Sequence, residues 1–244
     1  MREKIIGILG GMGPDATCVL FERIIRFTNA KCDSEHIRVI IDNNPKIPDR
    51  TGAILGKSVS PVSELVKTAA NLQNSGVDFI IIPCITSHYY FKEIQKEINV
   101  PILNALEITK EYIDKQCTNI NKIGVIATSG TVKTNLFQNL LKDKEIIIPT
   151  EEEQREYVME IIYGKDGVKA GNRSGKLKDY LAEIVEKLKG RGAEAIIAGC
   201  TEISIVLEQS DIDIPLIDPL TLMAQKSVLI AKNLNDSSSL DNRI

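Results

Sequence analysis

The sequence predicts an α/β fold made of two pseudo-symmetric domains, each with a mostly parallel sheet, and an active site in the cleft between them. Two observations carry this prediction. Short runs rich in Ile and Val alternate with amphipathic segments along the chain, and one half of the chain repeats the other. A length of 244 residues allows two modest domains that each bury a core.

The strands are predicted by runs that are apolar nearly throughout, which is typical of parallel strands covered on both faces. These runs are 4–10, 37–42, 78–84, 100–104, 122–128, 145–149, 194–200 and 214–218. Amphipathic stretches between them predict helices at 59–75, 105–117, 131–142, 151–163 and 176–190. This alternation favours βαβ units and a mostly parallel sheet. The polar tail, 233–244, is expected to be frayed.

The internal repeat is clearest around two cysteines. NLQNSGVDFIIIPCITS (71–87) aligns with KLKGRGAEAIIAGCTEI (187–203), and Cys84 then matches Cys200 at an offset of 116 residues (200 − 84 = 116). KIIGILGGMG, at the start of the chain, resembles KIGVIATSG, and VPILN resembles IPLID. Four matched features at a nearly constant offset in residue number indicate that the two halves are copies of one α/β unit.

The repeat defines the predicted domains. We expect an N-terminal half of residues 1–103, completed by 217–244, and a C-terminal half of residues 104–216. Ligands of open α/β sheets bind beyond the carboxyl ends of the strands, so both cysteines are expected to face one crevice from opposite sides.

Composition excludes several classes of function. A net charge of −3 and a pI near 5.6 give no basic field, so no nucleic-acid partner is expected. No apolar stretch approaches the ~20 residues of a membrane span, and the N-terminus lacks a signal sequence. We expect a cytoplasmic protein with a small-molecule substrate and no membrane partner.

The five cysteines are odd in number and form no CxxC pair, and the chain has only two histidines. These features argue against disulfides and against a metal site. Cys18, Cys32 and Cys117 are interpreted as space-filling residues. Cys84 and Cys200 differ because each ends a predicted strand where a helix starts, and such positions favour thiolate. Two opposed thiols could remove a proton from one face of a carbon acid and deliver one to the other face.

Five segments make a family resemblance recognisable: GGMGPDAT (10–17), NNPKIPDRT (43–51), PCITSH (83–88), VKAG (168–171) and GCTEI (199–203). Together, in this order and spacing, they resemble the aspartate racemase branch of the aspartate/glutamate racemase family along nearly the whole chain. The resemblance implies two pseudo-symmetric α/β domains and a homodimer. It also implies catalysis by Cys84 and Cys200 with no cofactor, neither pyridoxal phosphate nor metal.

The resemblance also implies a substrate site. Arg50 and Lys169 correspond to the family's cationic ligands of the substrate carboxylates, although Lys165 lies close to Lys169. The other residues predicted to bind substrate are Met12, Thr86, Thr201 and Glu202. Glu202 has an alternative role as a helix N-terminal acid, and the glycines beside Met12 have one as a tight turn. His88 has two interpretations, either orienting Cys84 or making a structural hydrogen bond.

One residue departs from the family pattern. The first cysteine is usually followed by Asn, and here it is followed by Ile85, which offers no hydrogen bond to a substrate. The resemblance predicts interconversion of L- and D-aspartate, with glutamate as a second substrate. The alternatives are a broad-specificity amino-acid racemase, another isomerase of the superfamily, or a non-catalytic amino-acid-binding protein.

Overall fold

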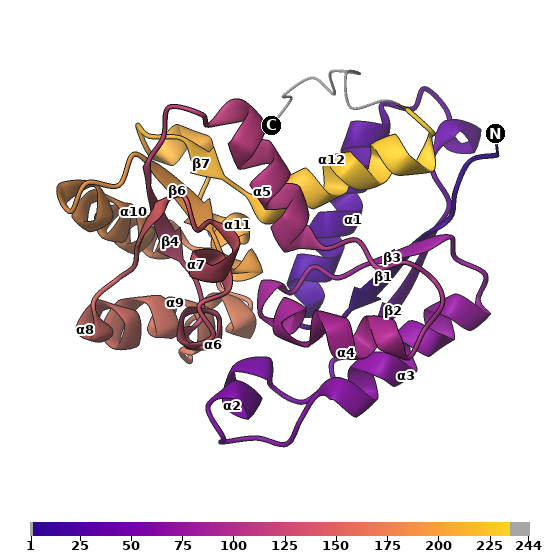
Figure 1. The fold of residues 1–244 in the computed structure, drawn as a ribbon, viewed down its shortest axis with the longest axis horizontal. Helices are drawn as coiled ribbons and strands as arrows, with labels where there is room; N and C mark the ends of the chain where they lie inside the picture. Colours follow the sequence, from indigo (N-terminus) through magenta and orange to yellow (C-terminus); the bar gives the residue numbers. More distant parts are fainter. Residues whose placement is uncertain (1, 235–244) are drawn as a thin grey trace.

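The computed structural model describes residues 2–234 and confirms the α/β fold, with two parallel sheets lying side by side (Figure 1). The tail predicted to be frayed is 233–244, and from residue 235 onward it lies outside this range. The strands are β1 (Ile6–Gly10), β2 (Val39–Asn43), β3 (Phe79–Ile81), β4 (Lys122–Ile126), β5 (Glu145–Ile147), β6 (Ala195–Ala198) and β7 (Leu216–Ile217). The first sheet has the order β2-β1-β3 and the second β5-β4-β6-β7.

The two sheets are copies of each other down to individual hydrogen bonds. A parallel bridge between Ile80 and Ile102 continues the first sheet at the place that β7 takes in the second. The Ile80 amide donates to Pro101 O at 2.9 Å, and the Ile196 amide donates to Pro215 O at 2.8 Å. The internal repeat seen in the sequence is therefore a repeat of backbone structure.

Helices surround both sheets. The longer ones are α1 (Pro14–Thr28), α3 (Val62–Asn74), α5 (Ala105–Gln116), α10 (Gly175–Gly190) and α12 (Pro219–Ala231). The shorter ones are α2 (Arg50–Ile54), α4 (Phe91–Lys96), α6 (Ser129–Lys133), α7 (Leu136–Leu140), α8 (Glu151–Glu153), α9 (Met159–Tyr163) and α11 (Thr201–Val206). Short 3-10 turns include η2 (Ile85–Tyr90) and η4 (Val168–Ala170), and a π-helical turn, η3 (Gln154–Val158), joins α8 to α9.

Most predicted helices begin and end within three residues of the observed ones, but the single helix predicted over 131–142 is wrong. The chain forms α6 and α7 instead, because Asn135 has a φ of 53° and interrupts the helix. Asn is one of the few residues that adopt this left-handed conformation readily.

One core runs through both halves. It contains Ile6 and Ile8 of the first sheet, Ile123 and Val125 of the second, and most of the buried side chains of α12. Two further cores lie on the outer faces, one beneath α3 and α4 and the other beneath α9 and α10. Because α5 and α12 pack on each other where the halves meet, the two sheets are held with their carboxyl ends close together (Figure 1).

No helix within residues 2–234 combines the length and apolar character that crossing a bilayer requires.

Candidate active site

The two matched cysteines lie at equivalent points of the two halves. Cys84 follows β3 and precedes η2, while Cys200 follows β6 and precedes α11. Both side chains are buried, and both line one cavity of about 10 Å³ between the halves. The crevice predicted from the repeat therefore exists, with a thiol on each side.

Every residue predicted for the site lines this cavity. Its wall consists of Met12, Arg50, Cys84, Ile85, Thr86, Thr128, Tyr163, Lys169, Cys200, Thr201 and Glu202. A larger outer cleft of about 640 Å³ lies beside it, and Met12, Arg50, Lys169 and Glu202 line both spaces. The inner cavity has room for about one water molecule, so a substrate enters only if this shared wall moves.

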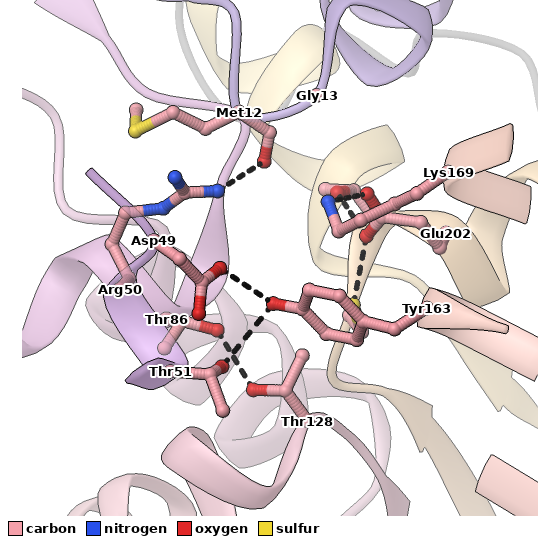
Figure 2. Close-up of polar contacts among 12 residues, drawn as sticks. Met12, Gly13, Asp49, Arg50, Thr51, Thr86, Thr128, Tyr163, Lys169 and Glu202 are labelled. Carbon is pink, nitrogen blue, oxygen red and sulfur yellow. Dashed lines mark hydrogen bonds and ion pairs between the residues drawn. The ribbon is translucent and has the colours of Figure 1, made fainter. Parts of the chain in front are cut away.

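Arg50 is a buried cation at the start of α2. Its guanidinium donates to the carbonyl oxygen of Met12 at 3.2 Å (Figure 2) and to that of Pro48 at 3.1 Å. Among residues 2–234, its Nε has no hydrogen-bond partner. Within residues 2–234 it forms no ion pair with a carboxylate. Burial lowers the pKa of Arg50, but the adjacent Cys84 sulfur raises it, and the net shift is upward. Arg50 is thus a charged group with capacity for an anion.

Lys169 and Glu202 form an ion pair on the opposite side of the cavity (Figure 2). Glu202 also accepts hydrogen bonds from the Cys200 sulfur at 2.8 Å and from Thr201 Oγ1 at 3.2 Å. Burial would raise the pKa of Glu202, yet Lys169 and the hydrogen bonds lower it below its usual range. Burial and the Glu202 charge raise the pKa of Cys200 well above that of an ordinary thiol.

The sequence profile of the Asp/Glu/Hydantoin racemase family matches residues 9–226. The chain belongs to this family. The broad-specificity amino-acid racemase RacX of Bacillus subtilis (strain 168) is 26% identical to it over 236 residues, which cover 92% of this chain and 96% of that protein. The family resemblance drawn from the sequence, and the conclusion that the chain is a racemase, are confirmed.

Solved structures of racemases are also similar to this chain. The Picrophilus torridus aspartate racemase is 27% identical, with a TM-score of 0.83 over 94% of both chains. The glutamate racemase of Francisella tularensis subsp. tularensis SCHU S4, in complex with D-glutamate, is 21% identical. Its TM-score is 0.65 over 98% of this chain and 86% of that chain, a likeness of fold alone.

Side chains of the two racemase halves meet at the cavity. Tyr163, from the second half, donates to Asp49 Oδ2 at 3.0 Å, and its ring lies 5.3 Å from the Lys169 ammonium (Figure 2). The Thr86 hydroxyl lies 2.9 Å from the Thr128 hydroxyl. Burial raises the pKa of Tyr163 far above its usual value, so its hydroxyl stays a neutral donor.

Thr128 and Tyr163 were missed by the sequence analysis. Thr128 had a signal, because the repeat places KIGVIATSG (122–130) opposite the GGMG loop that holds Met12. Tyr163 ends a predicted helix, and we find no sequence feature that marks it.

The remaining candidates are placed clearly. His88 is absent from the cavity wall; its Nδ1 lies 3.1 Å from Cys84 O, and its Nε2 accepts from the Ala105 amide at 3.1 Å. Burial lowers the pKa of His88 to about 4, so the ring is neutral and its hydrogen bonds go to backbone groups, one of them that of Cys84. Lys165 is exposed and lines neither space, whereas Lys169 lines both.

The GGMG loop makes a tight turn and also approaches the site. Gly11 has a φ of 93°, and a Cβ there would lie 2.3 Å from the Asn44 backbone. A Cβ on Gly13 would lie 3.6 Å from the Glu202 carboxylate. Both interpretations of these glycines therefore describe part of the structure.

Among residues 2–234 there is no group of three or more His, Cys, Asp or Glu side chains placed to hold a metal ion.

Proposed function

We propose that this racemase interconverts the enantiomers of an amino acid by proton transfer between Cys84 and Cys200, without pyridoxal phosphate or a metal. The observation that carries the proposal is the pair of buried thiols at equivalent strand ends, facing one cavity that the buried Arg50 and the ion-paired Lys169 also line.

In the proposed reaction, one sulfur is a thiolate and takes the proton from Cα, forming an S–H bond while the C–H electron pair moves onto the substrate. The other sulfur is a thiol and gives its proton to the opposite face of Cα, forming the new C–H bond. Two fixed groups supply positioning as well as acid/base chemistry. Arg50, Thr86 and Thr201 are proposed to hold the carboxylate and the charge that develops on it.

Two substrate ranges are supported by different observations. Arg50 and Lys169 are two separated cations, which suits a dicarboxylic substrate such as aspartate or glutamate. Ile85 in the cavity wall, and the engagement of Lys169 with Glu202, favour a broader range. The relatives include an aspartate racemase and a broad-specificity amino-acid racemase. We propose aspartate as the first substrate to test, acting in a cytoplasmic homodimer.

A chiral assay tests the proposal directly. Purified protein is incubated without added cofactor with the L- or D-form of aspartate, glutamate, alanine or lysine, and both enantiomers are separated and quantified. We expect activity that survives EDTA and hydroxylamine and is lost on thiol alkylation. Loss of activity with EDTA or hydroxylamine contradicts cofactor independence, and no conversion of any amino acid favours a binding protein instead.

A further inference from the structure

The two thiols have different polar neighbours. The Cys200 sulfur donates to the Glu202 carboxylate at 2.8 Å, and Glu202 is only 3% exposed. The Cys84 sulfur lines the same cavity wall as the Arg50 guanidinium, and the positive charge of Arg50 acts on it. Throughout residues 2–234, no carboxylate is hydrogen-bonded to the Cys84 sulfur. One sulfur therefore faces a negative charge and the other faces a positive charge.

The repeat locates the origin of this difference. Glu202 stands two residues after Cys200, and the matching position two residues after Cys84 is Thr86 (202 − 116 = 86). The Thr86 hydroxyl lies within hydrogen-bond distance of the hydroxyls of Thr128 and Thr131, across the interface between the halves. The position that holds a neutral threonine in one half therefore holds a buried carboxylate in the other.

Lys169 does not cancel the carboxylate's effect on Cys200. Its ammonium pairs with Glu202 and holds that carboxyl in its charged form, so Glu202 remains an acceptor for the thiol proton. A carboxylate within hydrogen-bond distance keeps a proton on sulfur, whereas a neighbouring guanidinium stabilises negative charge on sulfur.

We infer that Glu202 sets the resting protonation state of the site, with Cys200 held as the thiol acid and Cys84 left as the thiolate base. This inference rests on the proposed function and deepens it, because the free enzyme is then prepared for the enantiomer whose α-proton faces Cys84. After that turnover Cys84 carries the proton and Cys200 is a thiolate beside Glu202. Loss of a proton from Cys84 to solvent and uptake of one by Cys200 restore the resting state.

The test is site-resolved alkylation of the free protein. Iodoacetamide reacts with thiolate, and mass spectrometry of peptides reads Cys84 and Cys200 separately from pH 6 to 9. Both sulfurs are buried in the same cavity, so absolute rates also depend on opening, and the pH midpoint of each rate is the informative quantity. Arg50, Lys169 and Tyr163 also face the sulfurs, but their pKa values are all raised, so they keep one charge state in this range.

We expect the Cys84 midpoint to lie at least about one pH unit below the Cys200 midpoint. Glu202→Gln should lower the Cys200 midpoint by about one unit, which is about a tenfold rise in the thiolate fraction at pH 7.5. Glu202→Thr, which installs the residue of the other half, should act in the same direction. Glu208→Gln changes an exposed carboxylate shortly after α11 and should leave both midpoints unchanged.

A Cys200 midpoint at or below that of Cys84 in the wild type overturns the inference, and this comparison requires no variant to fold. An unchanged Cys200 midpoint in both Glu202 variants, with native circular dichroism, also overturns it. Alkylation is measured without substrate, so the expected midpoints in a protein that racemises nothing would refute only the proposed function.

Discussion

The Cys84 half and the Cys200 half share a backbone plan but not a chemistry. Asp78 donates its amide to Ile5 O at 2.9 Å, and Glu194, at the matching position, donates to Lys122 O at 2.8 Å. Asn104 caps α5 through the Leu106 amide, as Asp218 caps α12 through the Leu220 amide. The scaffold therefore delivers two cysteines to equivalent places.

The side chains that follow the cysteines break this equivalence. Ile85 and Thr86 follow Cys84, whereas Thr201 and Glu202 follow Cys200. The chain forms a 3-10 turn after Cys84 and an α-helix after Cys200. The proposed two-thiol reaction requires two groups on opposite faces of Cα with opposite protonation states. In that proposal, the repeated backbone supplies the first requirement and the unlike neighbours of the two cysteines supply the second.

The largest expected effect comes from removing either sulfur. Cys84→Ser and Cys200→Ser should each lower racemisation at least about 10³-fold, because an alcohol is too weak an acid to act as the anion near neutral pH. In D₂O, each variant should still exchange the Cα hydrogen of one enantiomer, and the two variants should prefer opposite enantiomers. Chiral separation followed by mass spectrometry reads both quantities.

Cys117→Ser is the matched control, since Cys117 is a buried thiol outside the cavity. It should keep wild-type activity. Full activity in either of the other Ser variants would remove that cysteine from the mechanism, and exchange of the same enantiomer by both would contradict opposed faces.

The next largest effects should come from removing the two cations of the cavity wall, Arg50 and Lys169. Arg50→Ala removes a cation that has no carboxylate partner within residues 2–234, so the loss of kcat/KM should reflect the substrate contact, about 2–4 kcal/mol or about 30- to 800-fold. Lys169→Ala should cost a similar amount, and it should also destabilise the fold because Glu202 loses its ion-pair partner. Steady-state kinetics and urea unfolding separate the two effects.

Lys165→Ala serves as the control, because that lysine is exposed and lies outside both spaces. A crippled Lys165→Ala beside a normal Lys169→Ala would reverse the assignment of the second cation.

The sequence predicted the backbone symmetry well but the polar contacts poorly. Strand positions follow from apolar runs, and the match of Cys84 to Cys200 follows from a repeat that is visible in the amino-acid sequence. Helix α12 was missed because apolar residues such as Leu222 and Ile230 also lie on its less buried side, so its sequence shows little amphipathic period. The contact between Tyr163 and Asp49 joins residues 114 positions apart, and no local pattern encodes such a pairing.

Between pH 7.5 and 5, His88 in the Cys84 half should make the stability of the fold sensitive to acid. The pKa of His88 is lowered to about 4 from an ordinary value of 6.5, so the unfolded chain takes up a proton below pH 6.5 while the folded chain does not. The free energy of unfolding should therefore fall as the pH drops, by about 2 kcal/mol at pH 5 and about 3 kcal/mol at pH 4. Urea unfolding between pH 7.5 and 5 measures this slope.

His88→Gln should flatten the slope in that range. Ser204 occupies the matching position in the other half and does not titrate, so Ser204→Ala should change the stability but keep the wild-type slope. Equal slopes in wild type and His88→Gln would show that His88 does not carry the acid sensitivity.

The smallest expected effect concerns Ile85, the apolar neighbour of Cys84. Ile85 is 2% exposed and belongs both to the shared core and to the cavity wall. Ile85→Asn would offer a donor and an acceptor to an acidic substrate, and one hydrogen bond to a charged group is worth about 1.5–3 kcal/mol. We expect kcat/KM for aspartate to rise about tenfold relative to that for a neutral amino acid.

The ratio of two substrates is the informative measurement because a buried amide also destabilises the fold. Partial unfolding lowers both kcat/KM values by the same factor, so it cancels in the ratio. Ile85→Val is the control: it keeps an apolar side chain, costs about 0.5–1.5 kcal/mol of stability, and should leave the ratio unchanged. An unchanged ratio in Ile85→Asn as well would mean that the substrate is read elsewhere, which leaves Arg50 and the Lys169–Glu202 pair as the groups that set specificity.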